Sequence, residues 1–160
     1  MLKVVSNTTP IISLLKLGRL ELLEQIYKNI SIPIAVFNEV EAEKTKRYYR
    51  DLSKIDWINI IEIENKQAIK FFLDLDAGEA EAIILATELK ADLIIFDEKL
   101  GRFHAKHVNL KITGTIGVLV KAKALGLIKE LKPLLDELTK KGVWISENFK
   151  TEIYKKVNEI

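Results

Sequence analysis

Short apolar runs alternate with amphipathic segments along most of the chain. Five of these runs have the length and composition of β-strands, at 2–6, 30–32, 57–63, 92–96 and, more weakly, 110–113. Between them, apolar residues recur at three- and four-residue spacing, which predicts helices. Strands that alternate with helices favour a mainly parallel sheet with helices on both faces. The pattern therefore predicts an α/β fold, a three-layer α/β/α sandwich.

Glycine, proline and capping residues set the limits of the expected helices. Segment 9–27 is predicted to form two helices that are separated at its glycine. Pro33 suits the first turn of a helix over 34–44, and Asp76 is expected to be an N-cap. The remaining helices are expected at 65–75, 77–90, 114–126, 128–142 and 147–160. Two structures are open for segment 44–56, an extension of the preceding helix or a loop.

Length and composition indicate one folded domain over 1–160. The chain has 160 residues, of which 48% are hydrophobic, with only 7 glycines and 3 prolines, so it can bury a substantial core. The net charge of +2 does not indicate a protein that coats nucleic acid, but it permits a local basic patch. The C-terminal helices, over 129–160, are expected to pack on the domain or to take part in dimerisation.

Two further features narrow the class of protein. The sequence has no cysteine, which excludes disulfides, thiol catalysis and cysteine-ligated metal sites. The N-terminal apolar run is too short for a signal peptide, and no stretch approaches the roughly 18 apolar residues of a membrane helix. We therefore expect a cytoplasmic protein with no membrane contact.

Polar side chains that could hold a metal ion follow two of the predicted strands and lie on two of the helices. Asn7 follows the first strand and Asp97 follows the strand at 92–96, while Glu39 and Glu81 are helical. The carboxyl ends of neighbouring parallel strands meet at one edge of a sheet. Carboxylates gathered there repel one another unless a cation lies among them, and oxygen ligands suit Mg²⁺ or Mn²⁺. Such an ion could activate water for phosphodiester hydrolysis.

Each acid also has a simpler interpretation when it is taken alone. Glu79 lies close to the start of its helix, where the helix dipole favours a negative charge. Glu98 is expected to face solvent. From spacing alone, a surface or capping role is the better prediction for any single acid.

The order of these motifs resembles the PIN domain, a family of metal-dependent ribonucleases. The matching segments are VVSNTTPIISLLKLGRL, IPIAVFNEV, LDAGEAEAIILATELKADLIIFDEKLGR and ITGTIGVLVKAKALGLI. The chain is most similar to the small, toxin-like (VapC-like) branch, whose C-terminal part continues as PLLDELTKKGVWISENFKTEIYK. The resemblance implies a PIN-like sandwich that hydrolyses RNA with Mg²⁺ or Mn²⁺. The toxin branch further implies a homodimer and a small antitoxin protein that blocks the site.

The resemblance also implies which residues form the site, an acidic cluster around one or two divalent ions. The positions carried over are Asn7, Glu39, Glu81 and Asp97, with Glu79, Thr8 and Thr115 as secondary candidates. Glu79 and Glu81 compete for one position, because the segment GEAEA offers two acids and only the register separates them.

Asn7 departs from the family, which has an aspartate at this position. An amide offers a neutral carbonyl oxygen of nearly the same shape, so it attracts a cation less and takes up no proton. One explanation is a weakened but working metal site. The alternative is a nuclease-derived module that binds nucleic acid or a partner without cleavage. A third role, capping of the following helix, is compatible with both.

Basic residues are the candidate RNA contacts. Lys99, Arg102 and Lys106 have helical spacing just beyond Asp97 and would share one face, where positive charge offsets phosphate charge. The other candidates are Lys16, Arg19 and His104. Two neighbouring aromatic residues, Tyr48 and Tyr49, could stack on bases, although packing on the core or on a second copy is the preferred role.

Overall fold

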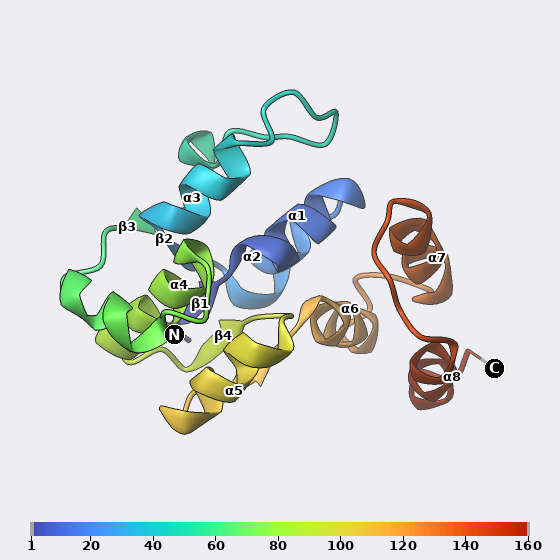
Figure 1. Ribbon diagram of the computed structural model, residues 1–160. Helices are drawn as coiled ribbons and strands as arrows, with labels where there is room; N and C mark the ends of the chain where they lie inside the picture. The colour runs from blue at the N-terminus through green and yellow to red at the C-terminus, as the bar shows by residue number, and fades with distance from the viewer. Residues whose placement is uncertain (1, 160) are drawn as a thin grey trace.

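A five-stranded parallel sheet forms the centre of the computed structural model, which describes residues 2–159 (Figure 1). Met1 and Ile160, the two ends of the predicted domain, lie outside the described residues. The strands are β1 (Val4–Ser6), β2 (Ile30–Pro33), β3 (Ile58–Ile61), β4 (Leu93–Ile95) and β5 (Ile112–Thr113). Their order is β3-β2-β1-β4-β5, and every neighbouring pair is parallel. The predicted strands and the predicted α/β class are confirmed.

Helices connect all of these strands, and three further helices follow the last strand. The α-helices are α1 (Thr8–Lys16), α2 (Leu22–Tyr27), α3 (Ile34–Glu41), α4 (Ala77–Glu88), α5 (Lys99–His107), α6 (Thr115–Ala124), α7 (Lys132–Lys140) and α8 (Glu147–Lys156). Two 3₁₀ helices are η1 (Leu52–Lys54) and η2 (Lys66–Phe72).

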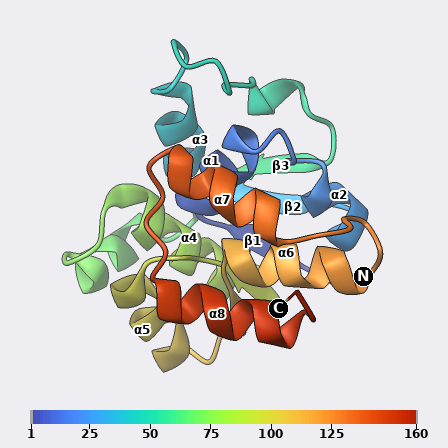
Figure 2. The ribbon, with the colours of Figure 1, turned by 90° about the vertical axis from the view of Figure 1, so that its right-hand side faces the viewer.

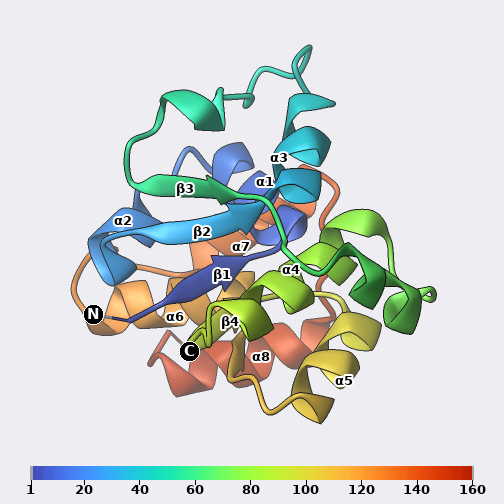
Figure 3. The ribbon, with the colours of Figure 1, turned by 90° about the vertical axis from the view of Figure 1, so that its left-hand side faces the viewer.

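Both faces of the sheet are covered, because alternate residues of each strand are buried on opposite sides. Val4 and Ile95 belong to one apolar cluster, and their neighbours Val5 and Ile94 belong to a second cluster. Helices α4 and α5 lie in front of the strands in Figure 3, whereas α6, α7 and α8 lie on the opposite side, which faces the viewer in Figure 2. Burial on both faces is what a purely parallel sheet requires.

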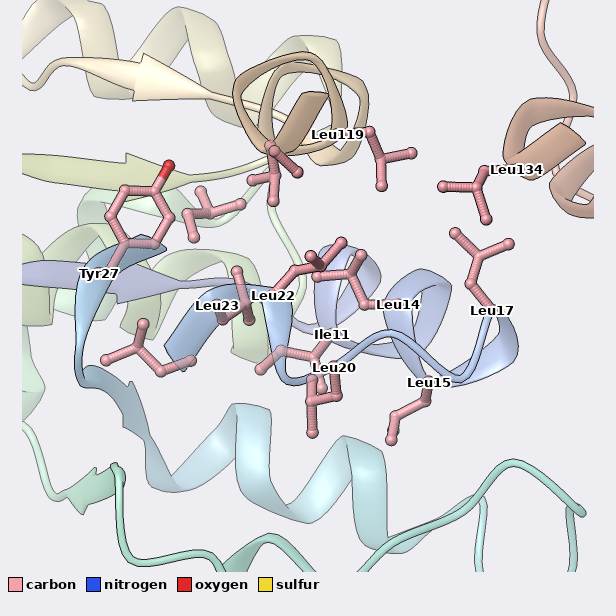
Figure 4. Close-up of a cluster of buried hydrophobic side chains, with 14 of the residues drawn as sticks. Ile11, Leu14, Leu15, Leu17, Leu20, Leu22, Leu23, Tyr27, Leu119 and Leu134 are labelled. Atoms are coloured by element: carbon pink, nitrogen blue, oxygen red, sulfur yellow. The ribbon is translucent and has the colours of Figure 1, made fainter. Parts of the chain in front are cut away.

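The larger cluster lies between the sheet and the helices α1, α2, α6 and α7. In Figure 4, Leu14, Leu22 and Leu23 of the two N-terminal helices point toward Leu119 of α6, and Leu134 of α7 lies beyond it. The predicted break between the first two helices occurs at Gly18, which has a φ of +66°. A left-handed backbone there favours glycine and lets α2 turn back against α1.

A side-chain cap marks the start of α4 and of α8, and two elements differ from expectation. Asp76 caps α4 as predicted: its Oδ1 accepts from Glu79 N at 2.8 Å, and the Glu79 carboxylate accepts from Asp76 N at 3.0 Å. Pro33 ends β2 and precedes α3, because it pairs with Ile61 in the sheet. Segment 65–75 forms η2 rather than an α-helix and buries no residue completely. Beyond α3, segment 44–56 continues as turns and η1.

The C-terminal helices are fastened to the domain by Glu159. Its carboxylate accepts hydrogen bonds from Lys123 Nζ at 2.7 Å, Leu131 N at 2.7 Å and Lys132 N at 2.9 Å. Burial raises the pKa of Glu159, but these hydrogen bonds lower it by more, so its net pKa lies below the ordinary value. One side chain therefore joins the end of the chain to α6 and to the start of α7.

We predict that Glu159→Gln lowers the stability of the fold at neutral pH. The lowered pKa means that the ionised carboxylate stabilises the folded state above its ordinary pKa, and this contribution disappears as the pH falls through the folded pKa. Loss of charge-assisted hydrogen bonds should cost about 2 kcal/mol at pH 7 and much less near about pH 3. Urea unfolding at both pH values measures the difference in the free energy of unfolding between Glu159→Gln and the parent, with the exposed Glu152→Gln as control. Equal stability of the Glu159 variant and the parent at pH 7 would contradict the prediction.

Candidate active site at the carboxyl edge of the sheet

Asn7 lies at the carboxyl end of β1 with only 1% of its surface exposed. Its backbone N–H donates to Ile95 O at 2.9 Å, which holds it beside the end of β4. The side-chain Nδ2 donates to Glu98 Oε2 at 3.1 Å, and Oδ1 is buried with no hydrogen-bond partner among the described residues. Asn7 occupies the N-cap position of α1, but its side chain makes no capping hydrogen bond. A buried acceptor without a partner is costly, so this oxygen requires an explanation.

Glu39 reaches the same edge from α3. Its Oε1 accepts from Thr8 Oγ1 at 2.6 Å and its Oε2 accepts from Gly78 N at 2.8 Å, in the first turn of α4. A Cβ at position 78 would lie 2.6 Å from Glu39 Oε2, so only glycine lets the carboxylate approach the helix so closely. The structure thus brings Glu39 and Thr8, both candidates from the sequence, into direct contact.

Asp97 follows β4 and is held by the first residue of α6. Its Oδ1 accepts from Thr115 N at 2.7 Å and its Oδ2 accepts from Thr115 Oγ1 at 2.6 Å. Thr115 is buried, with 5% of its surface exposed. Asp97 therefore has a fixed orientation, and Thr115, a secondary candidate from the sequence, is what fixes it.

Glu98 and Thr9 are members of this site that the sequence analysis missed. Glu98 is half-buried and accepts hydrogen bonds from Asn7 Nδ2 and Thr9 Oγ1, so the expectation that it faces solvent is wrong. The short segment between β4 and α5 thus carries two consecutive acids, Asp97 and Glu98, whose hydrogen-bond partners lie at the edge of the sheet. The signal in the sequence was the acidic pair itself, directly after an apolar strand.

The two competing acids of α4 have different surroundings. Glu81 Oε1 accepts from Ala35 N at 3.1 Å, so its carboxylate holds the start of α3. The pKa of Glu79 is raised by burial first, and then by the negative charges of Asp76 and Glu98. Glu79 therefore lies within electrostatic reach of Glu98, whereas Glu81 bonds to α3, and which of the two acids faces a cation stays a prediction.

These contacts form a continuous series around the edge of the sheet. Glu98 contacts Asn7, Thr8 contacts Glu39, and Glu39 contacts the backbone of α4 one residue before Glu79. In residues 2–159, no three acidic or histidine side chains are gathered closely enough to enclose a metal ion. The donor chemistry nevertheless fits Mg²⁺ or Mn²⁺, because every group offers oxygen and Asn7 Oδ1 is unpartnered. Each carboxylate also has about four acceptor positions, more than its hydrogen bonds occupy.

Three of the predicted RNA contacts lie beside this cluster, and the others do not. Asp97, Lys99, Arg102, Phe103 and Lys106 line one depression of about 450 Å³. In contrast, the last residue of α1, the candidate Lys16, lies about 12 Å along the helix from its start, and Arg19 follows it in the chain. Lys16 Nζ donates to Lys141 O at 3.5 Å. Of the candidates, those next to Asp97 therefore belong to α5, and a second hollow lined by Asp97 adds Lys121 and Lys156, which the sequence analysis did not propose.

The remaining candidates have structural partners. His104 Nε2 is 2.8 Å from Asp74 Oδ2, an interaction that joins α5 to the segment after η2. Tyr48 and Tyr49 are partly buried against the larger apolar cluster. Lys16 Nζ also lies 5.7 Å from the centre of the Tyr48 ring.

The parallel α/β sandwich carries an oxygen-rich site at its carboxyl edge. A family model described as PIN domain matches residues 3–159, and the chain belongs to the PIN domain family. No curated protein matches the chain. The resemblance to PIN domains is thus confirmed, whereas the toxin-like branch, the homodimer and the antitoxin remain predictions. Within residues 2–159, no helix has both the length and the apolar character needed to span a bilayer.

We predict that Gly78→Ala destabilises the protein, although alanine is the better helix former by about 1 kcal/mol. The added Cβ would displace the Glu39 carboxylate and weaken its hydrogen bonds to Thr8 and to the start of α4. A net loss of about 1–2 kcal/mol is expected in urea unfolding.

A double-mutant cycle tests the cause of this loss. In a Glu39→Ala background the carboxylate is absent, so Gly78→Ala should be neutral or stabilising. If Gly78→Ala lowers stability equally in both backgrounds, the close approach of Glu39 to α4 is not the cause of the destabilisation.

Proposed function

We propose that this protein is a divalent-cation-dependent ribonuclease that hydrolyses phosphodiester bonds of RNA. The observation that supports it best is the buried, unpartnered Oδ1 of Asn7, which lies among carboxylates at the carboxyl edge of the sheet. Membership of the PIN domain family supports a nuclease-type fold. The basic depression beside Asp97 supports a polyanionic substrate.

The proposed ligands of the cation are Asn7, Glu39, Asp97 and Glu98, with Glu79 close by. A bound Mg²⁺ or Mn²⁺ would supply an activated water and would offset the charge that develops on the phosphate. Glu81 has a positioning role in this proposal, since it holds the start of the helix that carries Glu39.

The other side chains bind and orient the reacting groups. Thr8, Thr9 and Thr115 each donate to one of the carboxylates and keep it in place. The three cations of the depression, Lys99, Arg102 and Lys106, would contact phosphates next to the scissile bond. No side chain forms a covalent intermediate in this scheme.

The alternative is a module that binds RNA or a partner protein without cleaving it. The neutral side chain of Asn7 favours it, because an amide attracts a cation less than a carboxylate does. In either case, a toxin role with a homodimer and a small antitoxin would require a partner surface, which these residues do not define.

We predict that the purified protein cleaves a mixed single-stranded RNA pool with Mn²⁺ or Mg²⁺ and not with EDTA. Asp97→Asn should reduce the rate at least about 100-fold, because the substitution removes a charged ligand and weakens the contact with Thr115. The exposed Asp56→Asn is the matched control, and a thermal melt checks that both variants fold. RNA that is bound but left uncut, equally by the parent and by Asp97→Asn, would support the binding module instead.

We also predict that Asn7→Asp has opposite effects without and with the metal. In EDTA the new carboxylate would face Glu98, to which Asn7 Nδ2 now donates, so stability should fall by about 1–3 kcal/mol. In Mn²⁺ the same charge attracts the ion, so the metal-induced rise in melting temperature should exceed that of the parent. Asn59→Asp, exposed on β3, serves as control. Identical melting of the Asn7 variant with and without Mn²⁺ would count against a cation at this edge.

A further inference from the structure

Two exposed aromatic side chains line separate hollows that share Asp97. Phe103 lines the basic depression, and Trp144 lines a smaller hollow of about 200 Å³. Asp97 contributes to the walls of both. We propose that the two rings are stacking platforms for unpaired bases of an RNA strand that passes Asp97 from one hollow to the other. This inference rests on the proposed function, since it assigns to Phe103 and Trp144 the contacts with the bases of the RNA that the same site takes.

The exposed ring of Phe103 does not contribute to the apolar core of the fold. More than half of its surface, 55%, is exposed, and it belongs to neither of the two apolar clusters. Its ring lies 4.4 Å from the ring of His107 and 5.7 Å from that of His104, both on the same helix. These neighbours support the ring from within α5 and leave the rest of it open to the depression that contains Lys99 and Lys106.

Trp144 is the most exposed of the large apolar residues, at 85%. It lies in the segment between α7 and α8, and its neighbours on both sides are anchored: Ile145 is buried and Val143 packs against the larger cluster. Because both neighbouring side chains pack against the core, the indole of Trp144 is kept at the surface. Thr9, Thr115 and Asp97 line the same hollow, so the indole lies next to the acidic site.

The chemistry of the two hollows favours a single-stranded nucleic acid over another occupant. Exposed aromatic rings stack on bases of any identity, but bases are accessible for stacking only when they are unpaired. The cations of α5 line the same depression as Phe103 and Asp97, where a backbone that carries one charge per nucleotide would need them. A protein partner could also cover exposed rings, but it would not by itself require cations next to carboxylates.

Binding measured without cleavage tests the proposal. The probe is a fluorescently labelled oligouridine of about 12 nucleotides, titrated with the protein in EDTA and followed by fluorescence anisotropy. Phe103→Ala and Trp144→Ala should each weaken binding about 10-fold or more, whereas Phe103→Trp and Trp144→Phe should retain it. Phe71→Ala is the matched control, because Phe71 is 76% exposed on η2 and lines neither hollow. A thermal melt confirms that each variant is folded.

Two further measurements use the same samples. A blunt RNA duplex should bind at least about 10-fold more weakly than the single strand, and its affinity should be insensitive to the two alanine substitutions. The single strand should quench tryptophan fluorescence in the parent and not in Trp144→Phe, since the second tryptophan, Trp57, is only 9% exposed.

Three outcomes would overturn the proposal. The first is equal single-strand affinity of the parent and both alanine variants, and the second is equal binding of duplex and single strand. The third is unchanged RNA affinity together with an altered sedimentation coefficient, which would identify the rings as a contact between protein molecules. The same measurements separate this inference from the proposed nuclease activity. RNA binding that depends on the two rings, without Mn²⁺-dependent cleavage, would support this inference alone. Mn²⁺-dependent cleavage that is unchanged in both alanine variants would support the nuclease activity alone.

Discussion

The structure depends on carboxylates that bind the N-terminal ends of neighbouring helices. Glu39 accepts from the first turn of α4, Asp97 from the first residue of α6, and Glu81 from the first turn of α3. In each case the acid and the helix belong to different elements, so one hydrogen bond fixes a tertiary contact. The partial positive charge at a helix N-terminus also offsets the charge of the acid. These hydrogen bonds reduce the repulsion among acids that lie at one edge of the sheet.

The same bonds explain why an amide is suitable at the end of β1. Asn7 donates where the acids accept: its Nδ2 gives a hydrogen bond to the Glu98 carboxylate. An aspartate would instead place a second carboxylate against Glu98. Asn7 therefore avoids this repulsion, and in the proposed function its Oδ1 would be a neutral ligand. The neutral amide, however, attracts a cation less strongly than a carboxylate would.

The sequence predicts the elements well because their signals are local. Apolar periodicity locates all five strands, and the capping box at Asp76 locates the start of α4. Packing between elements leaves no such signal. Glu79 and Glu81 are two residues apart on α4, about 200° around the helix, and only the position of α3 determines that Glu81 bonds to the backbone of α3. The hydrogen bonds of Glu98 likewise depend on the placement of Asn7 and Thr9 beside the end of β4.

The two hollows that share Asp97 differ in a way that bears on the proposed recognition of RNA. Phe103 shares its depression with three cations, whereas the hollow beside Trp144 has no basic residue in its wall and is lined mainly by Ile116, Leu138, Val143 and Ile145. In that proposal, salt should weaken contacts in the first hollow more than in the second, where stacking is the main interaction. In neither hollow does the proposed binding depend on hydrogen bonds to the edges of the bases. The asymmetry would orient a strand across the acids with little preference for its sequence.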